Sequence, residues 1–495
     1  MERLLIKAPR FTFPTLVLLG LALFTLVAVR SEGFYHADEH FQLLEFANYK
    51  LGQTPAADLP WEFRSQIRPT LQPAIAVGVI RAARAAGITS PFSWALLLRL
   101  LSGWLAVLVF ARIAARLSGS LGGDRMARIL FGAAILVWFM PYLSVRFSSE
   151  NWSALAFLAG LSFLPLDRDR RDTATITSCA VAGLFLGLSF VFRFQMGFAL
   201  VGVGAWLLFR GRIGTARLAA LGAGGLAAIA LGSAVDWWFY GNPVFTPWTY
   251  FASNIIQGKA AAFGVSPWWW YLPQFLMHAI PPIAAVLLVL AMIGACRARD
   301  HVITWAFVVF LVGHVVVGHK ELRFLFPMAF PFLFLVVVGW QRIRPRLGTG
   351  LAMRVTFGVL AVIDIVALLF AGTQAASTGV TTWRFLYGYS EHRPTTLYVQ
   401  GNSPYDYDVL QLHFYRAPQI AVVRIDTAAA LGDSSRYHPR DGDLLIPANG
   451  VLQPSAPGYR LTLVHRSVAA WMLRSDVTHW KERTHIWAVY RIDRR

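Results

Sequence analysis

Charged side chains are scarce in this sequence of 495 residues. Only 14% of the residues are Asp, Glu, Lys or Arg, whereas an ordinary soluble domain carries roughly 25%. Hydrophobic residues make up 56% of the chain. A deficit of charge on this scale argues against a large soluble core and indicates a membrane protein.

Cysteine is rarer still, with only Cys179 and Cys296 in the whole chain. The two lie far apart in apolar stretches, so the sequence contains no C-x-x-C metal spacing and no disulfide framework that could be inferred. Internal repeats and low-complexity tracts are also missing. The sequence therefore lacks the two related halves from which many transporters are built.

Acidic residues are outnumbered, because 26 Asp and Glu face 45 Lys and Arg, which gives a net charge of +19. A basic excess is typical of nucleic-acid-binding proteins. Here, however, the basic residues occupy short gaps between apolar runs, as they do in the cytoplasmic loops of membrane proteins. We therefore expect the lipid bilayer, and no nucleic acid, as a partner.

The apolar residues fall into runs long enough to cross a bilayer, which takes about 20 residues in a helix. The sequence predicts about eleven transmembrane helices, at 12–29, 92–111, 129–145, 151–166, 174–192, 196–210, 218–235, 275–295, 302–318, 323–340 and 355–372.

The ends of these spans carry a consistent charge pattern. No small-x-small cleavage site follows the first span, so we expect an uncleaved anchor rather than a signal peptide. With the N-terminus inside, every inner loop is basic and the C-terminus lies outside. The inner basic residues are Arg3, Lys7, Arg10, Arg112, Arg116, Arg125, Arg128, Arg168, Arg170, Arg171, Arg210, Arg212, Arg217, Arg297, Arg299, Arg342, Arg344, Arg346 and Arg354.

One apolar segment, 71–90, does not fit as a span. It contains Arg81 and Arg84, and a crossing here would place all later basic loops outside. We expect a re-entrant or interfacial helix in the first outer loop instead.

The last part of the chain changes character. Short alternating runs at 396–399, 420–425, 444–446, 460–464 and 486–492 are separated by turn signals such as Asn449-Gly450, a pattern typical of strands. We therefore expect an all-α polytopic membrane domain at 1–377, with outer loops at 30–91 and 236–273, and a small soluble α/β domain at 378–495 outside the membrane.

Two carboxylates stand near the start of the first outer loop, in the run His36–Gln42. Asp38 or Glu39 could accept a proton from an attacking hydroxyl, which is the general-base role, and carboxylates can also hold a metal. The alternative is a helix start, because acidic residues in the first turn are favoured by the backbone dipole. Spacing alone does not separate the two interpretations.

A cationic cluster, His319, Lys320 and Arg323, occupies a tight outer turn between two apolar spans. Cations on the outer side run against the usual charge bias, so a function is favoured over side chains that merely extend to the interface. A lipid phosphate at headgroup depth is the natural ligand, and the cations would stabilise a leaving phosphate.

Other polar and aromatic residues leave alternatives open. Arg193 and Arg146, each at the outer end of a span, could line a polar cavity or extend to the interface. Asp364 and His314 lie inside spans, where a hydrogen bond to a neighbouring helix and a packed core position are favoured over a functional role. The aromatic residues of 236–273 could stack on sugar rings or anchor the loop at the interface.

Three segments together resemble a known family. The pattern His36-x-Asp38-Glu39-x-x-Gln42 with Trp61–Pro69, the segment from Asp236 to Tyr271, and His319-Lys320-Glu321-x-Arg323-Phe324 are similar to motifs of glycosyltransferase family 22. That family contains GPI mannosyltransferase 3 and the N-glycan α-mannosyltransferases. The resemblance covers roughly residues 12–340, in matching order and sidedness.

The resemblance implies a GT-C fold and an inverting mannosyltransferase. The donor would be a polyprenyl-phosphate sugar and the acceptor a glycolipid or glycan hydroxyl on the outer face, giving an α-linkage without a nucleotide or a metal. By this resemblance Asp38 is the general base, Glu39 and His36 position or polarise it, and His319, Lys320 and Arg323 hold the donor phosphate. Arg64, Arg193, Trp248, Trp268 and Tyr271 would bind substrate.

The composition also indicates the source and location of the protein, and two other functions are alternatives. The many Arg, Ala and Gly residues are typical of a bacterial protein, so we expect an inner-membrane location with the site facing the periplasm. A transporter or flippase of a lipid-linked glycan is the alternative from another class, with Asp364 as its main acid at the bilayer midplane. A non-catalytic scaffold would leave the outward cations unexplained.

Overall fold

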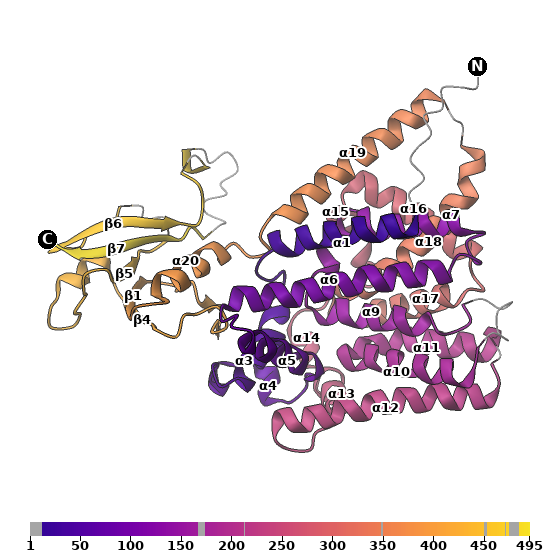
Figure 1. The fold of residues 1–495 in the computed structure, drawn as a ribbon, viewed down its shortest axis with the longest axis horizontal. Coiled ribbons are helices and arrows are strands. Elements are labelled where there is room, and N and C mark those ends of the chain that lie inside the picture. Colours follow the sequence, from indigo (N-terminus) through magenta and orange to yellow (C-terminus); the bar gives the residue numbers. More distant parts are fainter. Residues whose placement is uncertain are drawn as a thin grey trace. The chain divides into compact units, whose positions relative to one another are not determined.

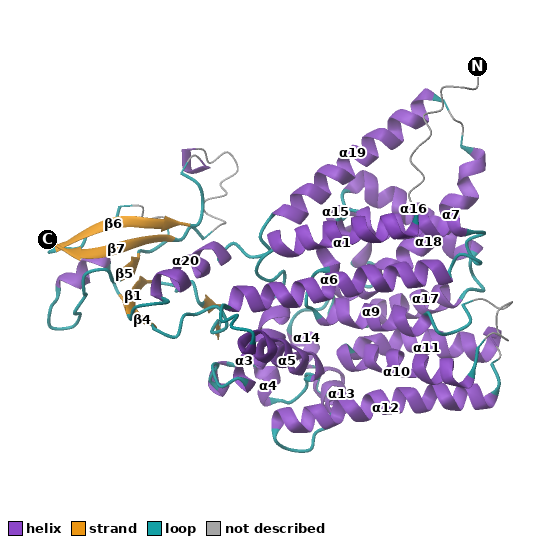
Figure 2. Ribbon diagram, in the orientation of Figure 1, coloured by secondary structure: helices purple, strands orange, loops and turns teal. Residues whose placement is uncertain are grey.

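The computed structural model describes residues 12–166, 174–211, 213–347, 350–449, 453–470, 472–474 and 485–495. The basic residues Arg3, Lys7, Arg10, Arg168, Arg170, Arg171 and Arg212, and Gly450 of one turn signal, lie outside this part. The described chain is mainly helical, and its strands follow residue 394 (Figure 2). It forms two compact units: unit 1 (Met1–Ser31, Trp61–Ala82 and Leu96–Gln374) and unit 2 (Glu32–Pro60, Ala83–Ala95 and Ala375–Arg495).

The long helices follow the predicted spans. In the described part of the chain, six are long and apolar enough to cross a membrane, and three further apolar helices are shorter. The six are α1 (Phe13–Arg30), α6 (Pro91–Arg116), Phe194–Gly211 with α11 (Gly197–Trp206) at its centre, α12 (Thr215–Tyr240), Leu322–Arg346 with α18 (Ala329–Ile343) at its centre, and α19 (Leu351–Thr373). The three are α10 (Ile176–Phe192), α16 (Pro281–Arg297) and α17 (Val302–Val316). Each falls on an expected span, so the polytopic helical architecture is confirmed (Figure 1).

Two expected spans have a different form. The span at 129–145 is divided into α7 (Asp124–Leu136) and α8 (Phe139–Ser144), and the span at 151–166 contains the short helix α9 (Ser149–Leu161). At the break, the side chain of Asp364 from α19 accepts a hydrogen bond from the backbone N–H of Trp138 at 3.2 Å. The predicted role of Asp364, a bond to a neighbouring helix, is therefore present and stabilises the interrupted helix.

Glycines let two pairs of helices approach closely. A Cβ atom on Gly183 of α10 would lie 1.9 Å from the Leu221 carbonyl oxygen of α12. In the second pair, a Cβ on Gly294 of α16 would lie 1.9 Å from the Leu335 oxygen, and one on Gly339 of α18 would lie 1.9 Å from the Leu290 oxygen. Small residues of this kind allow backbone contact between membrane helices.

Short helices connect the long ones. The apolar segment expected at 71–90 forms α5 (Leu71–Ala85), and the aromatic segment at 236–273 is largely helical. The remaining short elements of unit 1 are α4 (Trp61–Arg64), α13 (Thr246–Phe251), η6 (Ala252–Ile256), α14 (Lys259–Ala262), α15 (Tyr271–His278), η4 (Phe194–Met196), η5 (Leu207–Gly211), η7 (Leu322–Met328) and η8 (Arg344–Arg346).

Unit 2 contains the small α/β fold that the strand pattern predicted. Helix α20 (Val380–Ser390) precedes a five-stranded sheet in the order β4-β1-β5-β7-β6. Strand β1 (Thr395–Gln400) runs parallel to β4 (Ile420–Ile425) and β5 (Leu444–Ile446). Strand β7 (Ala488–Arg494) runs antiparallel to β5 and to β6 (Tyr459–Arg466). A hairpin of β2 (Asp406–Tyr407) and β3 (Leu410–Gln411) forms a separate two-stranded sheet.

The first part of the first outer loop, Glu32–Pro60, belongs to unit 2 as well. It forms α2 (Ala37–Glu39), η1 (His40–Leu44), α3 (Glu45–Lys50) and η2 (Ala56–Asp58). The Phe34 ring stacks on Trp383 at 5.9 Å, and the Phe34 N–H donates to the Ser377 hydroxyl at 3.0 Å. Residues that follow the last long helix are thus packed against the loop that follows the first. The predicted boundary at 377/378 stays a prediction.

Candidate functional site

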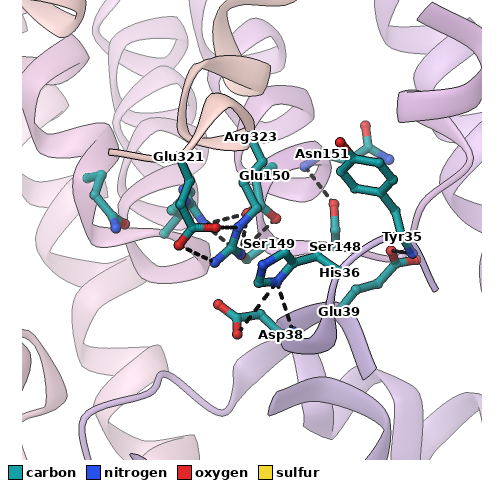
Figure 3. A network of polar contacts seen from close by, with 12 residues as sticks. Tyr35, His36, Asp38, Glu39, Ser148, Ser149, Glu150, Asn151, Glu321 and Arg323 are labelled. Carbon is teal, nitrogen blue, oxygen red and sulfur yellow. Dashed lines mark hydrogen bonds and ion pairs between the residues drawn. The ribbon is translucent and has the colours of Figure 1, made fainter. Parts of the chain in front are cut away.

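Two buried arginines of unit 1, with the groups that bond to them, form what we call the arginine cluster: Ser149, Glu150, Arg193, Glu321 and Arg323. Oε1 of Glu150 accepts from Arg193 Nη1 at 2.9 Å and from Arg323 Nη1 at 3.1 Å. Arg323 also donates from Nε and Nη2 to Glu321, at 2.6 and 3.0 Å (Figure 3). Bonds between charged groups of this kind are roughly twice as strong as neutral ones.

Three breaks in helical structure bring these side chains together. Glu150 lies in the first turn of α9, behind the N-cap Ser148, where the helix dipole favours a carboxylate. Arg193 is the residue between α10 and η4, with extended backbone. Arg323 lies in η7, directly after the turn at Glu321. Irregular backbone at such depth is tolerated where it is buried in protein or lines a polar cavity.

Arg193 has more donors than partners. It is 5% exposed, and its Nη1 donates to Glu150 and to the Ser149 hydroxyl, at 2.9 and 3.0 Å. Its Nε and Nη2 are buried with no hydrogen-bond partner in the part of the chain that the structure describes. Because buried donors are nearly always satisfied, these atoms indicate the position of a ligand or water.

The charges around the cluster do not balance. Arg193, Arg323 and the buried Lys320 supply three positive charges, whereas Glu150 and Glu321 supply two negative charges, which leaves an excess of one. Lys320 donates from Nζ to the Val317 carbonyl, and its burial lowers the pKa of the ammonium group. A buried site with surplus positive charge favours an anion.

The other predicted residues of unit 1 lie in two environments. His319 bonds from its two ring nitrogens to Glu321 and to the Gly264 carbonyl, each at 3.1 Å, so it joins the cluster. Tyr271 is 5% exposed, and burial raises the pKa of its hydroxyl, with the charge of Arg193 acting in the opposite direction. Trp248 and Trp268 are 59% and 71% exposed, and Arg64 is also exposed.

A second carboxylate in unit 1 fixes the aromatic segment. Asp236, at the end of α12, accepts from the Thr70 N–H and hydroxyl, both at 2.7 Å, and from the Thr246 hydroxyl at 2.6 Å. The Tyr240 hydroxyl donates to the Arg68 carbonyl at 2.8 Å. These bonds hold residues 66–70 against the segment that begins after α12.

In unit 2 the candidate base lies at a helix start, as the alternative interpretation expected. His36 is the N-cap of α2, and its Nδ1 accepts the N–H of Asp38 at 3.2 Å (Figure 3). The His36 ring therefore positions the residue that carries the carboxylate. Asp38 keeps 26% of its side chain exposed, whereas the buried Glu39 accepts the Tyr35 N–H at 3.0 Å and stabilises the preceding turn.

A buried ion pair follows directly. His40 and Glu45 are five residues apart across the π-helical turn η1, and their Nε2 and Oε1 atoms are 3.0 Å apart. Glu45 also accepts the N–H groups of His413 and Phe414, at 2.7 and 2.8 Å, and the Thr54 hydroxyl at 2.6 Å. Burial alone would raise the pKa of Glu45, but His40 and the hydrogen bonds hold it below its usual value.

Sequence reasoning missed Glu150, Glu321 and Glu45 as parts of these networks. Two arginines at the outer ends of separate spans could have suggested a shared carboxylate, because ionisable groups at membrane depth pair with one another. His314, in contrast, is the packed core histidine that was predicted, buried between Phe198 and Phe310. Among the described residues, no group of three or more His, Cys, Asp or Glu is arranged to hold a metal ion.

The chain is similar to known proteins over most of its length. GPI mannosyltransferase 3 of Candida albicans is 24% identical over 378 residues, which is 71% of this chain and 70% of that protein. GPI mannosyltransferase 3 of Yarrowia lipolytica is 25% identical over 333 residues, 65% of this chain and 62% of that protein. The crystal structure of ArnT from Cupriavidus metallidurans bound to undecaprenyl phosphate matches with a TM-score of 0.55 at 12% identity, covering 96% of this chain and 97% of ArnT.

The likeness to ArnT concerns the fold, and it confirms the GT-C architecture that the motifs predicted. The profile of the Alg9-like mannosyltransferase family matches residues 15–385. Since this match includes the helices of unit 1 and the loop that carries Asp38, the chain belongs to the Alg9-like mannosyltransferase family.

Proposed function

We propose that the protein transfers mannose from a polyprenyl-phosphate carrier to a hydroxyl group of a glycolipid or glycan, with inversion and an α-linkage in the product. Membership of a mannosyltransferase family supports the sugar and the reaction class. The observation that carries the proposal is Arg193, whose Nε and Nη2 are buried and have no hydrogen-bond partner among the described residues, beside a surplus of positive charge. A phosphate ester supplies the acceptor oxygens that these two nitrogens lack, and its negative charge matches the positive charge that Lys320 adds.

In the proposed reaction the acceptor hydroxyl attacks the anomeric carbon of a β-linked donor. The bond from that carbon to the phosphate oxygen breaks, and the bonding electrons leave with the carrier phosphate. Asp38 takes the proton of the attacking hydroxyl, the role of a general base. Arg193 and Arg323, with His319 and Lys320, stabilise the charge that develops on the leaving phosphate. A single displacement turns the β-linkage into an α-linkage.

Some substrate contacts and the location also belong to the proposal. Tyr271, beside the charges of Arg193 and Glu321, serves the sugar or phosphate of the donor. Arg64 and the exposed rings of Trp248 and Trp268 bind the carrier lipid or the acceptor at the membrane interface. The many Arg, Ala and Gly residues support a bacterial inner-membrane protein, and the basic inner loops support a site that faces the periplasm.

The test is mannose transfer by purified protein in lipid nanodiscs, with synthetic polyprenyl-phosphate [³H]mannose as donor and a total-lipid extract of the source cells as acceptor. We expect transfer by the wild type and a loss of roughly 10²-fold or more in Asp38→Asn, as for removal of a general base. Asp426→Asn, which changes an exposed carboxylate of unit 2, should retain activity. Full activity in Asp38→Asn would exclude Asp38 as the base, and no transfer by folded wild type would contradict the proposed donor or acceptor.

A further inference from the structure

The C-terminal part of the chain contributes an exposed aromatic residue to the loop that carries the candidate base. In the hairpin β2–β3, Tyr407 pairs with Leu410, and the turn between them contains Asp408, at a φ of 54°, and the 88% exposed Val409. A turn residue with positive φ keeps the hairpin tight. Tyr407 therefore has a defined position rather than that of a residue in a loose loop.

The Tyr407 ring packs on residues that flank Asp38 in the sequence. Its centroid lies 5.7 Å from that of Phe34 and 5.5 Å from that of Phe41. The residue nevertheless stays 44% exposed, so part of the ring is open. Burial raises the pKa of the Tyr407 hydroxyl, and the charges of Asp38 and Asp408 act in the same direction.

Both ends of the segment 403–415 are fixed within unit 2. At its start, the Trp383 indole donates to the Pro404 carbonyl at 2.7 Å. At its end, His413 and Phe414 donate their N–H groups to Glu45, and the His413 ring bonds to Asp58 at 2.8 Å. The segment is thus bound to the loop that carries Asp38, on the same structural unit.

An aromatic ring beside a carboxylate has the chemistry of a sugar-binding site. The ring packs on the apolar face of a pyranose, and the carboxylate accepts bonds from its hydroxyls. A hydroxyl that gives its proton to Asp38 must come within about 3 Å of it. An acceptor pyranose that carries this hydroxyl and extends toward Phe34 and Phe41 would pack on the open part of the Tyr407 ring.

We propose that Tyr407 forms, together with Asp38, a binding subsite for the acceptor pyranoside, supplied by the C-terminal segment 403–415. The inference rests on the proposed function, in which Asp38 is the base. It gives the C-terminal segment a substrate-binding role in addition to its structural one.

The experiment compares Tyr407→Ala, Tyr407→Phe and Val409→Ala in the nanodisc assay, with the same labelled donor and a titrated lipid extract. We expect Tyr407→Ala to raise the apparent KM for the extract about fivefold to tenfold, consistent with the loss of an aromatic contact, and to change the donor KM by less than about twofold. Tyr407→Phe keeps the ring and should retain most of the extract affinity. Val409→Ala, on the exposed turn of the same hairpin, should match the wild type.

An unchanged extract KM in folded Tyr407→Ala would overturn the subsite, as would an equal rise in the KM values of donor and extract. If the proposed function itself is wrong, the wild type will show no transfer that depends on Asp38. That result would also overturn the acceptor subsite. Tyr407→Phe keeps the contacts with Phe34 and Phe41. If only the alanine variant misfolds, the phenylalanine variant still tests the subsite. Its KM for the extract must then be close to that of the wild type.

Discussion

The carboxylate of Glu45 accepts a hydrogen bond from the backbone N–H of His413 at 2.7 Å, although 368 residues separate the two. The same carboxylate pairs with His40. Its removal would leave a buried histidine and two buried N–H groups without their acceptor. Breaking a buried pair by deleting one partner typically costs about 3–5 kcal/mol.

We therefore expect Glu45→Ala to destabilise unit 2 and to make residues 375–495 sensitive to protease under conditions where the wild type resists. Limited proteolysis followed by mass spectrometry would locate the cleavage sites. The matched control is Glu391→Ala, because Glu391 is exposed. Equal resistance in Glu45→Ala and the control would show that the Glu45 network contributes little.

The same carboxylate predicts a dependence on pH. The pKa of Glu45 is lowered from the ordinary value of 4.5 in the folded protein, so its ionised form stabilises the fold above pH 4.5 and that contribution is lost as the pH falls toward the lowered value. The difference in thermal unfolding temperature between wild type and Glu45→Gln should be largest at neutral pH and should shrink below pH 4.5. A difference that stays constant or grows with acidification would contradict this assignment.

Replacing Arg193 should change the KM for the donor selectively. In Arg193→Gln, the loss of charge-assisted bonds to a phosphate, worth about 1.5–3 kcal/mol, should raise the donor KM by roughly 10-fold to 100-fold and leave the extract KM nearly unchanged. Arg210→Gln is the control, since Arg210 is 48% exposed and pairs with an exposed Asp300. Steady-state kinetics in nanodiscs separates the two KM values, and an effect confined to the extract KM would reject the donor role.

Asp364 separates the transferase from the transporter interpretation. Because it binds the Trp138 N–H at the break between α7 and α8, Asp364→Asn keeps an acceptor oxygen and should retain mannose transfer. Asp364→Leu leaves the N–H unsatisfied, at a cost of about 1–3 kcal/mol, and should lower the unfolding temperature. A complete loss of activity in folded Asp364→Asn would favour a proton-coupled role for this residue.

The glycine contacts predict a steric effect between α16 and α18. A Cβ on Gly339 would lie 1.9 Å from the Leu290 carbonyl oxygen, so Gly339→Ala must separate the helices, at a cost of about 1–3 kcal/mol or more. Gly358→Ala, in α19, meets no atom within 4 Å and should be neutral. Thermal unfolding in detergent measures both, and equal unfolding temperatures would contradict the close approach.

Local sequence patterns predicted the six long and three shorter apolar helices of the described chain and the five strands of the larger sheet. Hydrophobic runs predict a helix because the bilayer imposes its length, and alternation predicts a strand such as Leu444–Ile446 because the pleat imposes a period of two. The expected span at 129–145 overlooked Pro141, which lacks the N–H that would bond to the Val137 carbonyl and whose ring collides with that carbonyl, so the helix breaks after Leu136. The partner that stabilises the break, Asp364, lies on a distant helix.

The candidate site could be predicted only as a set of residue types. The motif around His319 predicts outward cations, but not that Glu150 would join Arg193 to Arg323, since their three elements meet only in the folded chain. Nor does any local pattern indicate that Glu45 would receive the N–H groups of His413 and Phe414. Contacts between distant segments depend on packing, which a single sequence does not display. The catalytic and binding roles themselves stay predictions.

The division of unit 2 among Glu32–Pro60, Ala83–Ala95 and Ala375–Arg495 has a consequence for biosynthesis. The ribosome delivers the first two stretches long before the third, so the loop with Asp38 emerges when its partners do not yet exist. Glu45 accepts the hydrogen bonds of the His413 and Phe414 N–H groups only after these two residues have been synthesised. Unit 2 is thus completed only after the stretch Ala375–Arg495 has been synthesised, and a shorter nascent chain holds its candidate base on an unanchored loop.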